Sequence, residues 1–150
     1  MAKTVTGCLI IIGNEILSGR TQDINLAHLA KALNEFGVRM VHARVIPDVE
    51  DIIIETVNEC RETYDHVFTT GGIGPTHDDI TSAAIAKAFD LPLVRHPDAL
   101  EALEKYYKNN QHELNEQRLK MTETPEGATL IANAISIAPG FKIENVYVFA

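Results

Sequence analysis

The chain has 150 residues, 45% of them hydrophobic and 23% charged, which is typical of one globular domain with its own core. Thirteen Lys and Arg against twenty-one Asp and Glu give a net charge of −8, which disfavours nucleic acid and anionic membranes as partners. No segment has the pattern of a membrane span or a good signal peptide. We therefore expect a cytoplasmic protein.

Three strand-and-helix units follow one another at the start of the chain. Residues 5–12 form a β-branched run typical of a buried strand, and residues 21–37 predict a helix with one apolar stripe. Residues 38–46 alternate as a strand does, and Asp48 is placed to cap the next helix. A strand at 66–70 and a third helix complete the series. This order predicts a three-layer, doubly wound α/β fold with a mostly parallel sheet, and Cys8 and Cys60 in its core.

The pattern changes after residue 95. Pro97 opens a predicted helix, and the polar residues 108–121 indicate a second helix or a mobile flap. Short strands follow, with turns at Gly127 and Asn133. We interpret this part as a small helical or β-rich excursion within a single domain, residues 1–150.

A glycine-rich loop, GGIGPTHDD, occupies residues 71–79 after the third strand. Glycines let the backbone turn sharply and approach a ligand, so that its N–H groups can donate to phosphate oxygens. The alternative is an ordinary turn into the next helix, closed by Thr76 and Asp79 as in a capping box. The loop favours an anion site with these ligand-binding residues: Gly71, Gly72, Ile73, Gly74, Pro75 and Thr76.

Asp78 and Asp79 end this loop, where the next helix should begin. A carboxylate there gains about 0.3–1 kcal/mol from the helix dipole. A phosphate charge ~5 Å away would repel it by about 3 kcal/mol at an effective dielectric near 20. Since the repulsion is larger, a bound phosphate favours a divalent cation that bridges Asp78 and Asp79 to the phosphate oxygens. Plain helix capping, a protonated aspartate and a water bridge are the alternatives.

Each of the three strand-to-helix loops holds a carboxylate: Glu15, Asp48 and Asp79. In an open parallel sheet the carboxyl ends of the strands meet at one edge, where ligands bind. We expect the three carboxylates to meet there. Gly13, Asn14 and Glu15 either contact a ligand or only shape their turn. Two further polar residues are expected helix caps that could also face the cleft: Asp23 and Asn25.

These residues resemble the molybdopterin-binding (MoCF, MoaB/MogA-like) domain family. The family includes molybdopterin adenylyltransferases, the gephyrin G domain, CinA (competence/damage-inducible) proteins and the amino-terminal domain of eukaryotic FAD synthase. The resemblance rests on GNEILSGRTQDINLAHLAKALNEFGV, VIPD, TTGGIGPTHDDIT and APGF, which extend over nearly the whole chain. It implies a doubly wound fold, an edge that binds a pterin or a nucleotide with Thr81 among its residues, and frequent homo-oligomers.

Within the family, the loop is similar to those of CinA and the FAD synthase domain. Adenylyltransferases typically have Thr at the position of Ile73 and basic residues at those of His77 and Asp78. Asp48 and Asp79 match the positions of important aspartates in adenylyl-transfer members, so the resemblance implies catalytic roles for both.

The CinA-like branch implies metal-dependent cleavage, with Mg²⁺, Mn²⁺ or Co²⁺, of the pyrophosphate in ADP-ribose or FAD-like dinucleotides. The alternatives are a non-catalytic module that binds molybdopterin or a nucleotide, and a molybdopterin adenylyltransferase. Family members continue past the strand NVYVFA into a loop that closes the ligand site. We therefore expect this chain to be truncated at its C-terminus.

Overall fold

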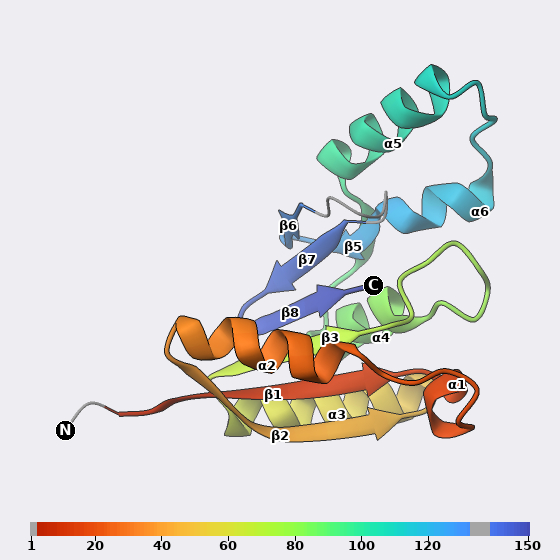
Figure 1. The fold of residues 1–150 in the computed structure, drawn as a ribbon. Helices are drawn as coiled ribbons and strands as arrows, with labels where there is room; N and C mark the ends of the chain where they lie inside the picture. Colours follow the sequence, from red (N-terminus) through yellow and green to blue (C-terminus); the bar gives the residue numbers. More distant parts are fainter. Residues whose placement is uncertain (1–2, 133–138) are drawn as a thin grey trace.

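A six-stranded sheet in the order β2-β1-β3-β8-β7-β6 forms the centre of the computed structural model, which describes residues 3–132 and 139–150 (Figure 1). The first four strands of this order run parallel, and β7 and β6 are antiparallel to their neighbours. The predicted mostly parallel sheet is confirmed, while the predicted turn at Asn133 lies outside the described residues. The strands are β1 (Val5–Ile12), β2 (Val38–Ile46), β3 (His66–Thr70), β6 (Thr129–Ile131), β7 (Gly140–Ile143) and β8 (Val146–Phe149).

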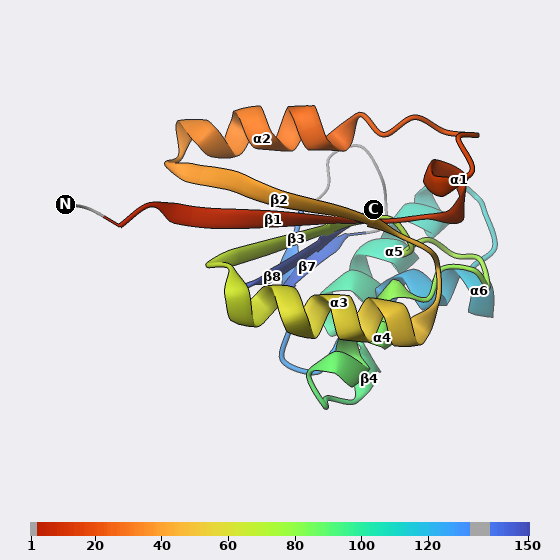
Figure 2. The ribbon, with the colours of Figure 1, turned by 90° about the horizontal axis from the view of Figure 1, so that it is seen from below.

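Helices cover both faces of the sheet (Figure 2). α2 (Asn25–Glu35) lies on one face, and α3 (Glu50–Thr63) and α4 (Thr81–Ala88) lie on the other. The chain crosses from β1 to β2 over the first face and from β2 to β3 over the second, and β3 pairs with β1 on the side away from β2. The boundary between β1 and β3 is therefore a topological switch point, where open α/β sheets bind ligands. No helix within the described ranges has the length and apolar character to cross a membrane.

β1 shows why its sequence is almost continuously apolar. Cys8, Ile10 and Ile12 pack into the core shared with α3 and α4, whereas Leu9 and Ile11 face the opposite side with α2. Every second residue thus meets a different helical layer, and both sets are buried. Because both faces of β1 are covered by helices, residues 5–12 form one nearly uninterrupted hydrophobic segment.

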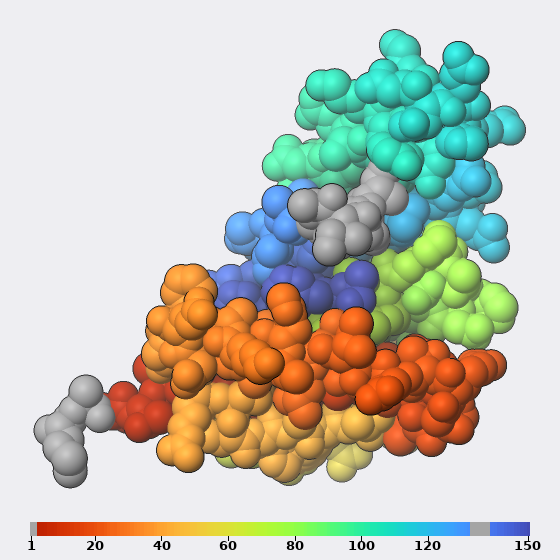
Figure 3. All heavy atoms as spheres, viewed as in Figure 1, coloured from red at the N-terminus to blue at the C-terminus, as the bar shows by residue number. Residues whose placement is uncertain are grey.

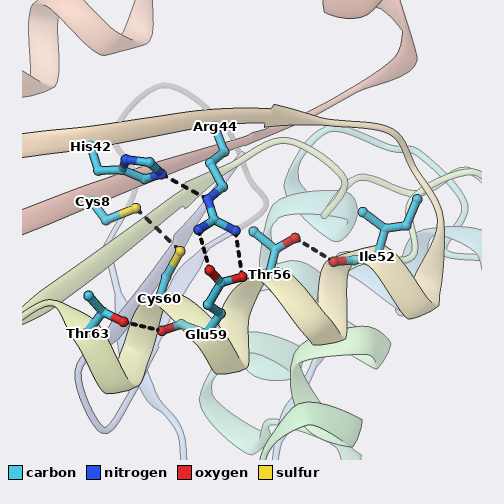
Figure 4. A network of polar contacts seen from close by, with 8 residues as sticks. All are labelled: Cys8, His42, Arg44, Ile52, Thr56, Glu59, Cys60 and Thr63. Carbon is cyan, nitrogen blue, oxygen red and sulfur yellow. Dashed lines mark hydrogen bonds and ion pairs between the residues drawn. The ribbon is translucent and has the colours of Figure 1, made fainter.

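The two cysteines lie in the core, as predicted. They lie beside a polar network that joins β2 to α3 (Figure 4). The Cys8 and Cys60 sulfurs are 3.6 Å apart and fully buried. The Arg44 guanidinium donates to both carboxylate oxygens of Glu59, at 2.9 and 2.8 Å, and its Nε donates to Nε2 of His42. The hydrogen bond with Cys60 and burial raise the pKa of the Cys8 thiol, which therefore stays protonated.

The excursion after residue 95 contains both helices and strands, as predicted. It forms a lobe that projects from the rest of the molecule (Figure 3), on the side of β7 and β6 in the ribbon view (Figure 1). The longest helix of the lobe begins at Pro97, which occupies its first turn. The His96 side chain caps this helix by accepting the N–H of Asp98. The lobe consists of α5 (Pro97–Asn109), α6 (Glu116–Leu119), the 3₁₀ turn η1 (Lys120–Thr122) and an antiparallel pair, β4 (Leu93–Arg95) with β5 (Glu123–Pro125).

Two predicted helix caps have different outcomes. Asp23 does cap α2, because its carboxylate oxygens accept the N–H groups of Asn25 and Leu26 at 3.2 and 3.0 Å. Asp48 does not cap α3, so this prediction was wrong. No side chain caps α3, which starts at Glu50, and the Asp48 carboxylate accepts a hydrogen bond from a different loop instead.

Asp65 ties the amino end of β1 to the connection between α3 and β3. Its Oδ2 accepts the N–H of Thr6 at 2.8 Å and the Thr6 hydroxyl at 3.2 Å. The backbone N–H of Thr6 is the main reason that the pKa of Asp65 lies below its ordinary value. Since the charged form is the one that is bonded, this stabilisation is present above the ordinary aspartate pKa. It is lost as the pH falls through the lower, folded-state pKa.

We therefore expect Asp65→Asn to lower the urea midpoint at neutral pH. The difference from the parent chain should shrink as the pH falls toward about 2, because both side chains are then uncharged. Urea unfolding across this pH range measures the effect. A difference that does not change with pH would contradict the proposed source of the stabilisation.

Candidate ligand site

The loops after β1, β2 and β3 meet at the carboxyl edge of the sheet, as predicted, but among the described residues their three carboxylates do not converge into one cluster. The first loop leads into α1 (Asn14–Leu17), and the N–H of Asn14 donates to Asp48 Oδ2 at 3.1 Å. In return, the N–H of Asp48 donates to Asn14 Oδ1 at 3.3 Å. Glu15 folds back over Gly13, where an added Cβ would lie 2.5 Å from Glu15 Oε1. The reciprocal pair of bonds places Asp48 at the edge and fixes the first loop to the second.

Gly71 and Gly72 pack the third loop tightly against the sheet and α4. Both adopt positive φ, +97° and +77°, which favours glycine. A Cβ on Gly71 would lie 2.1 Å from the Ile12 carbonyl oxygen, and one on Gly72 would lie 2.1 Å from the Thr81 hydroxyl. That hydroxyl is buried and donates to the Gly71 carbonyl at 3.0 Å. Thr81, predicted as a ligand-binding residue, therefore braces the loop in this structure.

The rest of the loop closes on itself. Ile73 was also predicted to bind ligand, but its side chain is 6% exposed and packs in the core, so only its backbone can face a ligand. Asp79 and Thr76 are in contact, but they do not cap the next helix as predicted, because α4 begins at Thr81 and no side chain caps it. Asp79 Oδ2 accepts the N–H of Thr76 at 2.9 Å and its hydroxyl at 2.7 Å. It folds over Gly74, where a Cβ would lie 2.8 Å from the same oxygen. Pro75 lies between Gly74 and Thr76, the two residues that Asp79 contacts.

The two predicted metal ligands are engaged separately. Asp78 is exposed, and its Oδ1 lies 3.3 Å from Nε2 of His77. Asp79 accepts a hydrogen bond from the Thr76 hydroxyl. Among residues 3–132 and 139–150, no three His, Cys, Asp or Glu side chains converge as a resident metal centre requires. The described side chains do not fit such a centre, and metal binding by Asp78 and Asp79 stays a prediction.

A pocket of about 320 Å³ lies at the switch point between β1 and β3. Its apolar wall contains Ile11, Ile12, Ile16 and Ile24, and Gly71 and Ala150 border it. The predicted residues Glu15, Asp23 and Asn25 line it, together with three that the sequence analysis missed: Thr21, Gln22 and Thr70. Thr21 and Gln22 lie in a polar segment before α2 that has no recognisable spacing, so only the fold shows their place.

Thr70 is the last residue of β3 and one of the residues that line the pocket. It is 7% exposed, and its hydroxyl has no hydrogen-bond partner among the described residues. A buried hydroxyl without a partner costs about 1–3 kcal/mol. The Thr70 hydroxyl oxygen is itself buried, so a ligand in the pocket does not reach it in this structure. A threonine directly before a glycine loop is the only signal for Thr70 in the sequence.

A second, small cavity of about 20 Å³ separates the third loop from the excursion. Gly74 and Asp79 line it from the loop, and Lys120 and Glu123 line it from the excursion. The Lys120 ammonium donates to the Thr76 carbonyl. Figures 1 and 3 show the loop beside α6, to which η1 is joined. Lys120 and Glu123 lie far along the chain from the loop and belong to no motif, so the sequence does not indicate their place beside it.

Comparison with known proteins agrees with this architecture. A family model described as "Probable molybdopterin binding domain" matches residues 8–149. A CinA-like protein of Kosmotoga olearia is 38% identical over 137 residues, which are 91% of this chain and 33% of that protein. The first curated relatives are longer, and the chain spans between 33% and 59% of their length.

Two solved structures extend the comparison. The crystal structure of CinA from Thermoplasma acidophilum superimposes with a TM-score of 0.86 at 33% identity, covering 95% of this chain and 87% of that one. The tungsten cofactor synthesizing protein MoaB from Pyrococcus furiosus has a TM-score of 0.57 at 20% identity, covering 99% and 82%, and so shares the fold. From the match over residues 8–149 and the CinA relatives, this chain belongs to the molybdopterin-binding domain family and is CinA-like within it.

Proposed function

We propose that the carboxyl edge of the sheet binds a pterin or a pyrophosphate-bearing nucleotide. The observation that carries this proposal is the pocket of about 320 Å³ at the switch point, with isoleucines on its wall and the polar residues that precede α2 along its lining. The family to which the chain belongs supports a small-molecule ligand of this kind, and molybdopterin is one candidate.

The lining of the pocket indicates which part of the ligand it takes. Its volume is at the lower end of ordinary ligand pockets, which suits one ring system better than a whole dinucleotide. Isoleucines provide apolar walls for a flat ring, while the Glu15 and Asp23 side chains bring carboxylates to the rim. Carboxylates accept hydrogen bonds from ring N–H and amino groups but repel phosphate. We therefore place the ring in the pocket and the phosphates outside it.

The third loop supplies donors for those phosphates. The N–H groups of Gly72, Ile73 and Gly74 donate to no acceptor within the described ranges. Successive free backbone N–H groups in a tight turn form an anion-binding concavity. Gly71 borders the pocket and joins it to this turn, so one ligand can occupy both.

We further propose that the site hydrolyses the pyrophosphate of ADP-ribose or an FAD-like dinucleotide, as its CinA-like loop suggests. Water would add to one phosphorus while the bridging P–O bond breaks, which gives AMP and a second phosphate product. Asp48 is held at the edge by one carboxylate oxygen and can use the other to orient that water. A divalent ion, Mg²⁺, Mn²⁺ or Co²⁺, would supply charge neutralisation when carried on the phosphates, since Mg²⁺ often binds through one or two carboxylates plus substrate phosphates.

The test is chromatography of ADP-ribose and FAD after incubation with the chain and each of these ions. The family resemblance implies a catalytic role for Asp79 as well, so we expect Asp79→Asn to reduce AMP release at least ~100-fold. The fold should persist, because an asparagine oxygen can still accept the Thr76 N–H. Asp51→Asn, an exposed substitution in the first turn of α3, is the matched control.

The other outcomes separate the alternatives. Unchanged turnover by Asp79→Asn would remove Asp79 from the mechanism. Ligand binding in calorimetry without AMP release would favour the non-catalytic module. The lack of a cluster of three His, Cys, Asp or Glu side chains in the described ranges is consistent with that alternative. Product formation that requires ATP would favour adenylyl transfer. Assembly into homo-oligomers stays a prediction, which light scattering would test.

A further inference from the structure

Lys120 connects the excursion to the glycine loop across 44 positions of the chain. Its Nζ donates to the carbonyl oxygen of Thr76. A lysine ammonium has three N–H donors, so this contact leaves two for other acceptors. Thr76 is held from the other side by Asp79, which accepts both its N–H and its hydroxyl.

The backbone that carries Lys120 is well anchored. Asn115 accepts the N–H of Arg118 at the start of α6. Thr122, at the end of η1, is buried, donates its hydroxyl to the Leu119 carbonyl and accepts the N–H of His96 at its own carbonyl. The ammonium is therefore presented to the loop from a fixed turn.

The charges around Lys120 leave it available to an anion. The cavity beside it is lined by the carboxylates of Asp79 and Glu123, and among the described lining residues Lys120 is the single cation. The ion pairs within the described ranges do not include it. The loop from 71 to 79 contains two aspartates and no Lys or Arg, so a phosphate held there meets no permanent positive charge of the loop itself.

We propose that Lys120 supplies this positive charge, donating to a phosphate oxygen of the ligand while it holds the Thr76 carbonyl. This inference rests on the proposed function, and it adds a phosphate-binding residue to the same site. A cation of the protein compensates the aspartates at the position where a resident metal ion was expected and where the described side chains form no metal centre. An ammonium close to a phosphate attracts it as strongly as a carboxylate at the same distance repels it.

The experiment compares binding of ADP-ribose and of adenosine, which lacks phosphate, by calorimetry in EDTA. We expect the parent chain to bind ADP-ribose without a divalent ion. Lys120→Gln should weaken ADP-ribose binding at least tenfold, as loss of a charge-assisted hydrogen bond does, and leave adenosine binding unchanged. Glutamine keeps an N–H donor for Thr76, so this variant removes the charge while retaining the means to hold the loop. Lys120→Arg, which keeps the charge, should bind ADP-ribose within about threefold of the parent.

Lys108→Gln is the matched control, because the same substitution removes an exposed cation from α5 in the same excursion. It should bind both molecules as the parent does. Equal ADP-ribose affinity for Lys120→Gln and the parent would overturn the inference, and so would parent binding that requires a divalent ion. Both of these results leave the proposed function standing. If the parent chain bound neither molecule in EDTA or with added Mg²⁺, the proposed function and this inference would both fail.

Discussion

Gly71→Ala is expected to lower the free energy of unfolding by about 2–5 kcal/mol and to abolish ligand binding. The new Cβ would lie 2.1 Å from the Ile12 carbonyl oxygen, which belongs to the backbone of β1 and cannot rotate away. The residue would also keep a φ of +97°, a conformation that side chains rarely adopt. Relief requires the third loop to move away from β1, and this movement would open the pocket that Gly71 borders.

Gly127→Ala separates the two causes. Gly127 has a similar φ of +86°, but a Cβ there would meet nothing within 4 Å. Gly127→Ala should lower the free energy of unfolding by about 1 kcal/mol, because only the strain of the positive φ remains. Urea unfolding of the two variants measures the difference, and calorimetry with ADP-ribose measures the loss of binding in Gly71→Ala. Equal stability losses would show that contact with Ile12 does not determine the cost.

The fold could be predicted because its signals are local. The apolar run of β1, the alternation in β2 and the stripe of α2 each follow from which layer the element meets. The positions of the three strand-to-helix loops then indicated that these loops share one edge of the sheet, since parallel strands end together. These steps need no knowledge of contacts between distant residues.

The contacts that complete the site could not be predicted in this way. Asp48 follows a proline and precedes a helix, so its local signal is that of a cap. A partner 34 residues earlier, the N–H of Asn14, uses its carboxylate instead. The family resemblance implied Thr81 as a ligand contact, but its burial and its hydrogen bond to Gly71 show a bracing role. Lys120 reaches the loop only through the path of the excursion, which no periodicity records.

The bracing role of Thr81 leads to a second large effect. Thr81→Val keeps the shape of the side chain but removes the donor to the Gly71 carbonyl, which loses a buried partner. We expect a loss of about 1–3 kcal/mol in the free energy of unfolding. Weaker binding of ADP-ribose should accompany it, because the bond fixes the turn that borders the pocket. Thr81→Ser retains the donor and should bind as the parent does, at a stability cost of about 1 kcal/mol for the lost methyl group.

Thr69→Val is the contrasting control, since Thr69 is also fully buried but its hydroxyl has no partner among the described residues. Replacing an unpaired buried hydroxyl with a methyl group should leave stability unchanged or raise it by about 1 kcal/mol. Thermal and urea unfolding of the three variants therefore compare the same chemical change with and without a hydrogen bond. Similar losses for Thr81→Val and Thr69→Val would mean that burial of threonine, and not its bond to Gly71, holds the loop against the sheet.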